Sequence, residues 1–169
     1  MNPQIGLGGS CHWCTEGIFR SVKGVEKVRQ GWVSATPPHD TFSEGVLFEY
    51  DPRFLSLYDL LAIHLHSHSC TSAHRMRNKY RSAIYVFNAD QGFESHHAIE
   101  KLQSEFDEQI VTEVLHFEDF KLNSEEYLDY YHRNPEKPFC KTHIEPKLIS
   151  LMSRYSNVFK AEQIAHGEK

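Results

Sequence analysis

The sequence predicts a mixed α/β domain in which helices pack against a sheet. Along the chain, residue patterns give the order strand, helix, strand, strand, helix, strand, followed by a further helix and strand. A strand-helix-strand-strand-helix-strand unit is the split βαβ, or ferredoxin-like, plan. The 169 residues, 40% of them hydrophobic and 24% charged, suffice for one globular domain. We therefore expect residues 1–169 to form a single α/β (α+β) domain, a ferredoxin-like two-layer sandwich with a C-terminal extension.

The first half of this plan begins with a short apolar segment at residues 5–8, which ends in a pair of glycines. Apolar residues then recur on one helical face over residues 15–23, and Gly24 is a typical helix stop. Residues 25–33 and 44–50 are rich in β-branched and aromatic residues, which predicts two strands. Two prolines between these strands predict a loop.

The second half begins with an amphipathic helix at residues 56–66, followed by a polar loop and a strand at residues 81–87. Residues 90–107 predict a long helix, and residues 110–117 predict the last strand. The inward face of the long helix is expected to carry Phe93, Ile99, Leu102 and Phe106.

The C-terminal extension contains a predicted helix at residues 146–158. After it, residues 161–169 are polar and are expected to form a frayed tail.

Charge and composition argue against several classes of protein. The formal net charge of −5 disfavours nucleic acid or an anionic membrane surface as the main partner. No apolar run approaches the roughly 18 residues of a spanning helix. The N-terminus lacks the basic and apolar regions of a signal peptide, so we expect a cytoplasmic protein that does not bind membranes. The four cysteines are too few for a disulfide scaffold in this chain, and they indicate reactive thiols, metal ligands or core residues.

The strongest local signal is a cysteine between a glycine-rich strand end and the start of a helix. Cys11 follows Gly-Gly-Ser at residues 8–10. Unsatisfied N–H groups and the helix dipole stabilise a thiolate at such a position, so Cys11 is the candidate nucleophile. Together with Cys14 it forms a C-x-x-C pair. That pair alone fits a dithiol, half of a zinc site, or a nucleophile with a separate proton donor.

Segments along the chain resemble, in order, the motifs of the type A peptide methionine sulfoxide reductase family. Residues 9–16, Gly-Ser-Cys-His-Trp-Cys-Thr-Glu, are similar to the signature G-C-F-W-[GC]-x-E. Residues 79–85, Lys-Tyr-Arg-Ser-Ala-Ile-Tyr, resemble Q-Y-R-S-A-I-Y. The resemblance covers about residues 3–150 and implies one domain of this family. Further matches are F-x-x-L-x-G-V at 19–25, G-Y at 31–32, H-A-E with Y-D-P at 42–44 and 50–52, and N-P with Y-C at 134–135 and 139–140.

This resemblance implies thiol-dependent reduction of methionine-(S)-sulfoxide, free or in proteins, which repairs oxidative damage. In that reaction Cys11 would attack the sulfoxide sulfur, Glu44 would protonate the departing oxygen and Tyr80 would hold it. Cys140 is the resolving thiol that the family implies, and Cys11 would pass from a sulfenic acid to an intramolecular disulfide. The resemblance implies no cofactor or metal, and thioredoxin or another dithiol would supply the electrons.

The walls of the implied substrate pocket depart from the family pattern. Trp13 matches the tryptophan that takes the substrate methyl group, but His12 stands where the family has phenylalanine. Trp32 stands in place of tyrosine, and Arg75 in place of aspartate. We expect these four residues to contact the substrate and to change which sulfoxide fits.

The residues leave alternatives open at the resolving step and for the function. Cys14 is an alternative resolving thiol, because C-x-x-C geometry permits a bridge to Cys11. A general thiol–disulfide oxidoreductase would use these two cysteines and would need neither Glu44 nor Cys140. The remaining alternative is a non-enzymatic module that binds a sulfoxide or zinc.

Two further groups are interpreted as structural. Glu16 lies in the first turn of the predicted helix, where a carboxylate complements the helix dipole. His64 and His68 would share a helical face, but His64 falls among leucines. We interpret it as a core histidine and predict no metal site.

Overall fold

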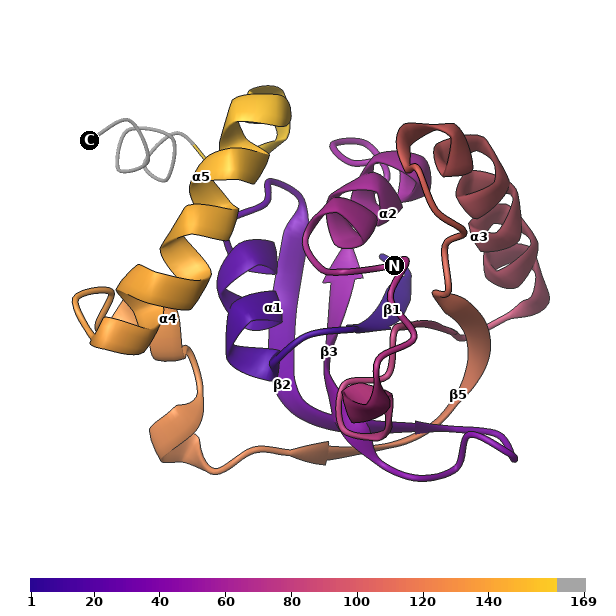
Figure 1. The fold of residues 1–169 in the computed structure, drawn as a ribbon, viewed down its shortest axis with the longest axis horizontal. Coiled ribbons are helices and arrows are strands. Elements are labelled where there is room, and N and C mark those ends of the chain that lie inside the picture. Colours follow the sequence, from indigo (N-terminus) through magenta and orange to yellow (C-terminus); the bar gives the residue numbers. More distant parts are fainter. Residues whose placement is uncertain (161–169) are drawn as a thin grey trace.

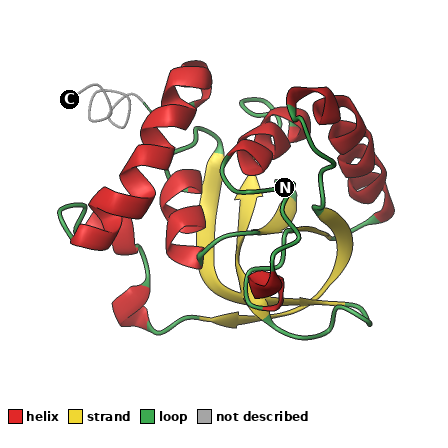
Figure 2. Ribbon diagram, in the orientation of Figure 1, coloured by secondary structure: helices red, strands yellow, loops and turns green. Residues whose placement is uncertain are grey.

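Figures 1 and 2 show the computed structural model, which describes residues 1–160. The expected tail at residues 161–169 lies outside the described residues. The predicted order of strands and helices is confirmed. The strands are β1 Gln4–Gly8, β2 Val25–Ala35, β3 Ser43–Tyr50, β4 Ala83–Val86 and β5 Glu113–Leu122. The α-helices are α1 His12–Phe19, α2 Leu57–His66, α3 Ala89–Leu102, α4 Tyr130–Arg133 and α5 Glu145–Arg154. The short helical turns are η1 Arg75–Asn78, η2 Gln103–Glu105, η3 Glu125–Tyr127, η4 Cys140–Ile144 and η5 Ser156–Val158.

The strands form a closed barrel in the order β1-β3-β2-β5-β4. Only β4 and β5 pair in parallel, and the other pairs are antiparallel. The mixed α/β class is confirmed, but the sheet is not the open layer of a two-layer sandwich. The cause is β5, which pairs with β4 through residues 113–116 and with β2 through residues 117–122. The strand predicted at residues 110–117 is too short to make both pairings.

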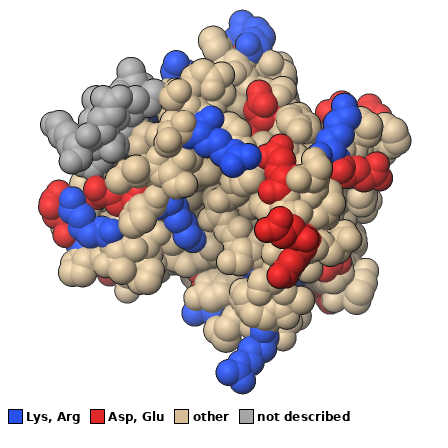
Figure 3. All heavy atoms as spheres, turned by 45° about the horizontal axis from the view of Figure 1, so that its top comes forward, with Lys and Arg blue, Asp and Glu red and all other residues tan. Residues whose placement is uncertain are grey.

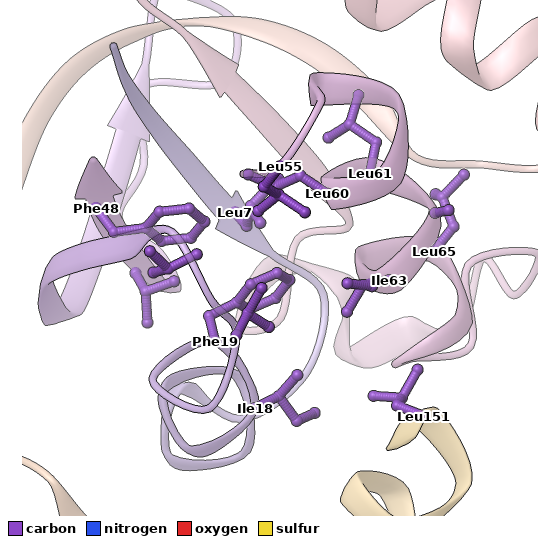
Figure 4. Packing of buried hydrophobic residues seen from close by; sticks show 14 of the residues in the cluster. Leu7, Ile18, Phe19, Phe48, Leu55, Leu60, Leu61, Ile63, Leu65 and Leu151 are labelled. Atoms are coloured by element: carbon purple, nitrogen blue, oxygen red, sulfur yellow. The ribbon is translucent and has the colours of Figure 1, made fainter. Parts of the chain in front are cut away.

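Alternate residues on the strands face two separate cores, as the two-residue strand period requires. Leu7 and Phe48 belong to the larger core beneath the helices, where Figure 4 shows them beside Phe19 of α1. The rings of Phe19 and Phe48 stack with their centroids 5.2 Å apart. Leu47 and Tyr85 lie on the opposite face of the sheet and belong to the smaller core. The larger core anchors α1, whose first turn carries the C-x-x-C pair.

Three of the four residues predicted to face inward from helix α3 and its end do so: Leu102 is buried, and Ile99 and Phe106 pack partly buried against the larger core. Gln91 is buried, where its side chain accepts a hydrogen bond from Phe87 N (2.8 Å) and donates one to Gln4 O (2.7 Å). Because Gln91 points inward, Phe93, two residues further along the helix, points to the opposite, solvent-facing side. Phe93, expected to be inward, is 76% exposed, whereas Leu102 is buried as predicted.

The C-terminal segment packs mainly against α1 rather than against the sheet (Figure 1). Gly17 of α1 permits this, since a Cβ there would lie 3.1 Å from Tyr131 Cβ and 3.2 Å from Ile144 Cγ2. The helix predicted at residues 146–158 is present as α5, which ends at Arg154, followed by η5. This packing places the segment around Phe139 beside the C-x-x-C pair.

None of the helices in residues 1–160 combines the length and apolarity needed to cross a bilayer. Figure 3 shows both acidic and basic side chains on the face drawn, separated by uncharged stretches. No continuous basic surface covers that face.

Gly31 on β2 is required where β5 crosses to close the barrel. A Cβ at this position would lie 1.9 Å from Lys121 O, well inside contact distance. We predict that Gly31→Ala lowers the free energy of unfolding by at least about 2 kcal/mol, because the backbone of β5 must shift. Urea unfolding would measure this change.

The matched control is Gly92→Ala in α3, where a Cβ would lie 3.5 Å from Val86 Cγ2, an ordinary contact. Alanine has the higher helix propensity, so this variant should be neutral or more stable by up to about 1 kcal/mol. Equal effects of the two substitutions would contradict the role given to Gly31.

Candidate active site

Cys11 is held at the N-terminus of α1, immediately after the end of β1. Its backbone is extended (φ −58°, ψ 139°), and its carbonyl accepts hydrogen bonds from Cys14 N (3.1 Å) and Thr15 N (3.2 Å). Gly9 shapes this turn: its φ is +150°, and a Cβ there would overlap the His68 ring at 2.5 Å. The side chain of Cys11 is half-buried, so it remains reachable.

The environment of Cys11 stabilises its thiolate. The hydrogen bond from the Cys14 thiol is the largest cause, and it lowers the pKa of Cys11 to about 4. The His12 side chain and the N–H groups of Cys14 and Trp13 lower this pKa further, against the opposing effect of burial. The same interaction raises the pKa of Cys14 well above its ordinary value. These interactions therefore favour the thiolate on Cys11 and the protonated thiol on Cys14.

On one side Cys11 opens into a cavity of about 510 Å³, here called the aromatic cavity. The structure brings together there every predicted catalytic or substrate-binding residue except Cys140 and Arg75. Its lining residues are Cys11, His12, Trp13, Trp32, Glu44, Lys79, Tyr80, Asn123, Tyr127 and Phe139.

Glu44 is placed on β3 directly opposite Trp32 of β2. Its side chain is buried, and Oε1 accepts a hydrogen bond from His12 N at 3.2 Å. Oε1 also lies 3.3 Å from His12 Nδ1, and Oε2 lies 3.6 Å from Lys79 Nζ. The strand thus delivers a buried carboxyl group to the side of Cys11, which suits a group that exchanges protons with a ligand.

Trp13 is fixed by aromatic residues from the C-terminal part of the chain. Its ring stacks on Tyr130 with centroids 4.1 Å apart and planes 6° apart, and it also stacks on Tyr127 at 5.7 Å. Phe139 meets it edge-on at 5.3 Å. These residues, and Asn123 beside them, are missing from the sequence-based prediction. The segment has no regular period that would predict its contact with Trp13, and only its many tyrosines are a signal.

On the other side Cys11 opens into a second cavity of about 540 Å³, here called the histidine cavity. Cys11, Tyr80 and Phe139 line both cavities, whereas Cys14 lines only this one. The remaining lining residues are Gly9, Ser10, His66, Ser67, His68, Ser69, His74, Met76, His143 and Lys147.

The structure places Arg75 outside both cavities, exposed on η1. Its expected contact with the substrate stays a prediction. Arg77, two residues on, turns inward and donates hydrogen bonds to Gly9 O (2.7 Å) and Tyr80 O (2.9 Å). Arg77 therefore joins the loop that carries Tyr80 to the turn before Cys11, a role that the sequence did not indicate.

His64 is the core histidine that the sequence indicated. Its Nε2 hydrogen-bonds to Gly8 O at 2.8 Å, and burial lowers its pKa to about 4. His68 hydrogen-bonds to His64 O and Ser82 Oγ, both at 2.7 Å, and burial holds its pKa well below the ordinary value. Neither ring is directed at Cys11 as a metal ligand. Among the described residues, the metal-ligating types that do come together are Cys11, His12 and Glu44, with ligand atoms within 4.8 Å of one another.

Cys140 is fully buried at the start of η4 and lines neither cavity. Cys140 and Cys14 both belong to the larger hydrophobic core. All four cysteines are free thiols in this structure. Cys140 therefore lies in the core rather than at the surface of either cavity.

The chain matches the model of the family described as peptide methionine sulfoxide reductase over residues 3–159. The peptide methionine sulfoxide reductase MsrA of Acinetobacter baumannii (strain SDF) is 32% identical over 171 residues, covering 93% of this chain and 98% of that protein. The MsrA of Haloquadratum walsbyi is 30% identical over 170 residues, covering 92% and 98%.

Solved structures share the fold. Mxr1 from Saccharomyces cerevisiae in its reduced form has a TM-score of 0.72 at 21% identity, covering 84% of this chain and 91% of that one. Mxr1 in complex with Trx2 has a TM-score of 0.61 at 20% identity, covering 76% and 84%. The fold, the cysteine at the helix start and these matches define a thiol-based reductase class. The chain belongs to the peptide methionine sulfoxide reductase family.

The dependence of the Cys11 pKa on Cys14 is testable with two variants of similar size. We predict that Cys14→Ala raises the pKa of Cys11, because the thiol donor is lost, whereas Cys14→Ser keeps a donor and has a smaller effect. The pH dependence of alkylation by iodoacetamide would report the thiolate. Its midpoint should move up by at least about one pH unit in the alanine variant. Identical profiles for all three proteins would show that Cys14 does not stabilise the thiolate.

Proposed function

We propose that this chain reduces methionine-(S)-sulfoxide, free or in proteins, to methionine, with a thioredoxin-like dithiol as reductant and no prosthetic group. Membership of the family supports the reaction. The observation that carries it in this chain is the position of Cys11, which opens at the start of α1 into the aromatic cavity beside Glu44 and Tyr80. These groups supply a nucleophile, an acid and a hydroxyl around one space.

In the proposed first step, the Cys11 sulfur attacks the sulfoxide sulfur and the S–O oxygen takes up a proton delivered by Glu44. Tyr80 holds that oxygen by a hydrogen bond. The S–S bond formed by the attack and the substrate S–O bond then break as the oxygen passes to the Cys11 sulfur. Cys11 is oxidised by two electrons to a sulfenic acid, and the sulfoxide is reduced by two electrons and leaves as a thioether. Trp13 and Trp32 supply apolar walls for the methyl group.

In the proposed second step, a thiol attacks the sulfenic acid and releases water. Cys14 is favoured for this role, because it lies one helical turn from Cys11 at the start of α1 and lines the histidine cavity with it. The raised pKa of Cys14 comes first from the interaction with Cys11, then from burial and from the Cys11 charge. Oxidation of Cys11 removes the first and the last of these causes, whereas the burial of Cys14 remains. Cys140, the resolving thiol that the family resemblance implies, requires η4 to open first. An external dithiol then reduces this disulfide and is itself oxidised to a disulfide.

A general thiol–disulfide oxidoreductase is the second candidate, and the contact between Cys11 and Cys14 favours it. Such an enzyme would not need a buried carboxyl group, and Glu44 is therefore the residue that separates the two functions.

We also propose a ferredoxin-like topology, a single domain and a cytoplasmic location for this protein. The antiparallel order β4-β1-β3-β2, with α1 and α2 in the connections, supports a ferredoxin-like unit that β5 closes into a barrel. The family match across residues 3–159 supports one domain. Four free thiols are consistent with a reducing compartment such as the cytoplasm.

Glu44→Gln tests the reaction. With pre-reduced protein and a methyl (S)-sulfoxide, but no added reductant, we expect one equivalent of thioether in the wild type and the loss of two thiols. Glu44→Gln keeps the shape of the side chain but carries no transferable proton, so the single-turnover rate should fall on the order of 100-fold. Unchanged disulfide exchange in this variant is the control. A wild type that yields no thioether would contradict the proposed function.

The same assay on Cys14→Ser and Cys140→Ser identifies the resolving thiol. We expect Cys14→Ser to lose one thiol and to accumulate a sulfenic acid that dimedone traps, because the neighbouring thiol is absent. Cys140→Ser should still lose two thiols. The reverse result would assign resolution to Cys140 and would require η4 to open during turnover.

A further inference from the structure

His12 lies at the end of a buried chain of polar side chains that begins at Glu16. Gln30 Nε2 donates hydrogen bonds to Glu16 Oε1 and to the Tyr127 carbonyl, both at 2.8 Å. Asn123 Nδ2 donates to Gln30 Oε1, and it also lies 3.4 Å from His12 Nε2. Glu16 and Gln30 are 1% and 0% exposed, and His12 and Asn123 are 7% and 9% exposed.

The direction of every hydrogen bond in this series of side chains follows from Glu16, its first residue. A carboxylate and a carbonyl only accept, so the Gln30 NH₂ group must face Glu16 and Tyr127, and Gln30 Oε1 must face Asn123. Asn123 therefore presents its NH₂ group to Gln30. The Asn123 oxygen accepts from Ser124 N at 2.8 Å, which fixes the same orientation.

The second N–H of Asn123 then points at His12 Nε2, which must be an unprotonated acceptor. A neutral imidazole with a lone pair on Nε2 carries its proton on Nδ1. This series of hydrogen bonds therefore selects the tautomer of His12 that carries its proton on Nδ1.

Nδ1 of His12 is a buried donor without an aligned hydrogen-bond acceptor among the described residues. It lies 3.3 Å from Glu44 Oε1, and the ring lines the aromatic cavity with Cys11. Such an unmade hydrogen bond is costly in a buried site, and a ligand oxygen that accepts it is favoured. The Cys11, His12 and Glu44 atoms lie within 4.8 Å of one another, so an oxygen bonded to the attacked sulfur is within reach.

We propose that His12 is a catalytic hydrogen-bond donor, whose Nδ1–H binds the sulfoxide oxygen, and that Glu16, Gln30 and Asn123 are positioning residues that fix its proton. The ligand in this inference rests on the proposed function, but the tautomer does not. As Cys11 attacks, negative charge develops on the oxygen, and a fixed donor stabilises it without reorganisation.

This assignment argues against a metal at Cys11, His12 and Glu44. Metal coordination through Nδ1 needs the proton on Nε2, where it would face the N–H of Asn123. The other groups able to titrate or carry charge in the cavity are Lys79, Tyr80 and Tyr127.

Nitrogen NMR of protein labelled with ¹⁵N-histidine tests the tautomer, with the His12→Phe spectrum to assign the signal. We expect a neutral ring with the proton on Nδ1 in the wild type. Asn123→Ala should allow the Nε2–H form to appear, whereas the exposed Asn157→Ala should change nothing. A wild-type ring protonated on Nε2, or one that binds zinc tightly, would overturn the assignment.

Single-turnover kinetics test the role of the donor. The amide nitrogen of His12→Asn comes close to the position of Nδ1, that of His12→Gln falls nearer Nε2, and His12→Phe has no donor. We expect Asn to retain most of the rate, and Gln and Phe to lose about 10- to 100-fold. The matched control is His96→Phe, an exposed histidine of α3 that lines neither cavity.

The pH dependence of alkylation by iodoacetamide, measured for each variant, reports the Cys11 thiolate. It separates a loss of thiolate from a loss of the hydrogen bond to the sulfoxide oxygen. A Phe variant as fast as the Asn variant, at equal thiolate content, would overturn the inference. If the wild type reduces no sulfoxide, the proposed function fails, and the NMR result still decides the tautomer.

Discussion

The buried carboxylate of Glu16 is the interaction on which the site depends. It accepts hydrogen bonds from Gln30 Nε2 (2.8 Å), Asp129 N (2.9 Å) and Tyr130 N (3.3 Å), and Arg20 Nε lies 3.3 Å from its second oxygen. A buried charge is tolerated only when it is paired and hydrogen-bonded in this way. The carboxylate thereby ties α1 to β2 and to the backbone that follows η3.

The aromatic wall of the site is a consequence of these bonds. Because the N–H groups of Asp129 and Tyr130 are held against α1, the rings of Tyr127 and Tyr130 reach Trp13. The structural role predicted for Glu16 is supported by its hydrogen bonds, but the reason given for it is wrong: α1 begins at His12, so Glu16 lies beyond the first turn. The hydrogen-bond partners of Glu16 account for its burial, which the helix dipole alone does not.

Local patterns sufficed for the order of elements and for much of the site. Cys11 begins a helix because a strand and glycines precede it, and the pairing of β2 with β3 then sets Glu44 opposite Trp32. Long-range choices were not visible in the same way. The double pairing of β5 depends on which edges remain free after the first four strands assemble. The exposure of Phe93 depends on a buried glutamine whose partners lie on two other segments.

The missed site residues share one physical origin. Asn123, Tyr127 and Phe139 lie in segments whose contacts with α1 span more than a hundred residues, so no period reveals them. Long-range contacts also explain why Arg75 is exposed whereas Arg77 points inward. Both lie on one 3₁₀ turn, and Arg77 is the arginine whose guanidinium group reaches backbone carbonyl groups, those of Gly9, Ser69, Ser72 and Tyr80. Resemblance places a residue type near a site, but hydrogen-bond partners determine which side chain enters it.

Cys11 stands between two cavities of nearly equal size, about 510 and 540 Å³, with unlike walls. The aromatic cavity carries Glu44, His12 and two tryptophans, which suits a methyl group joined to a polar oxygen. The histidine cavity carries Cys14 instead. For the proposed cycle, this arrangement separates the two reactions of one sulfur atom. The sulfoxide approaches from the aromatic side, while a disulfide between Cys11 and Cys14 faces the other side. A dithiol reductant can then attack the disulfide without passing through the substrate pocket.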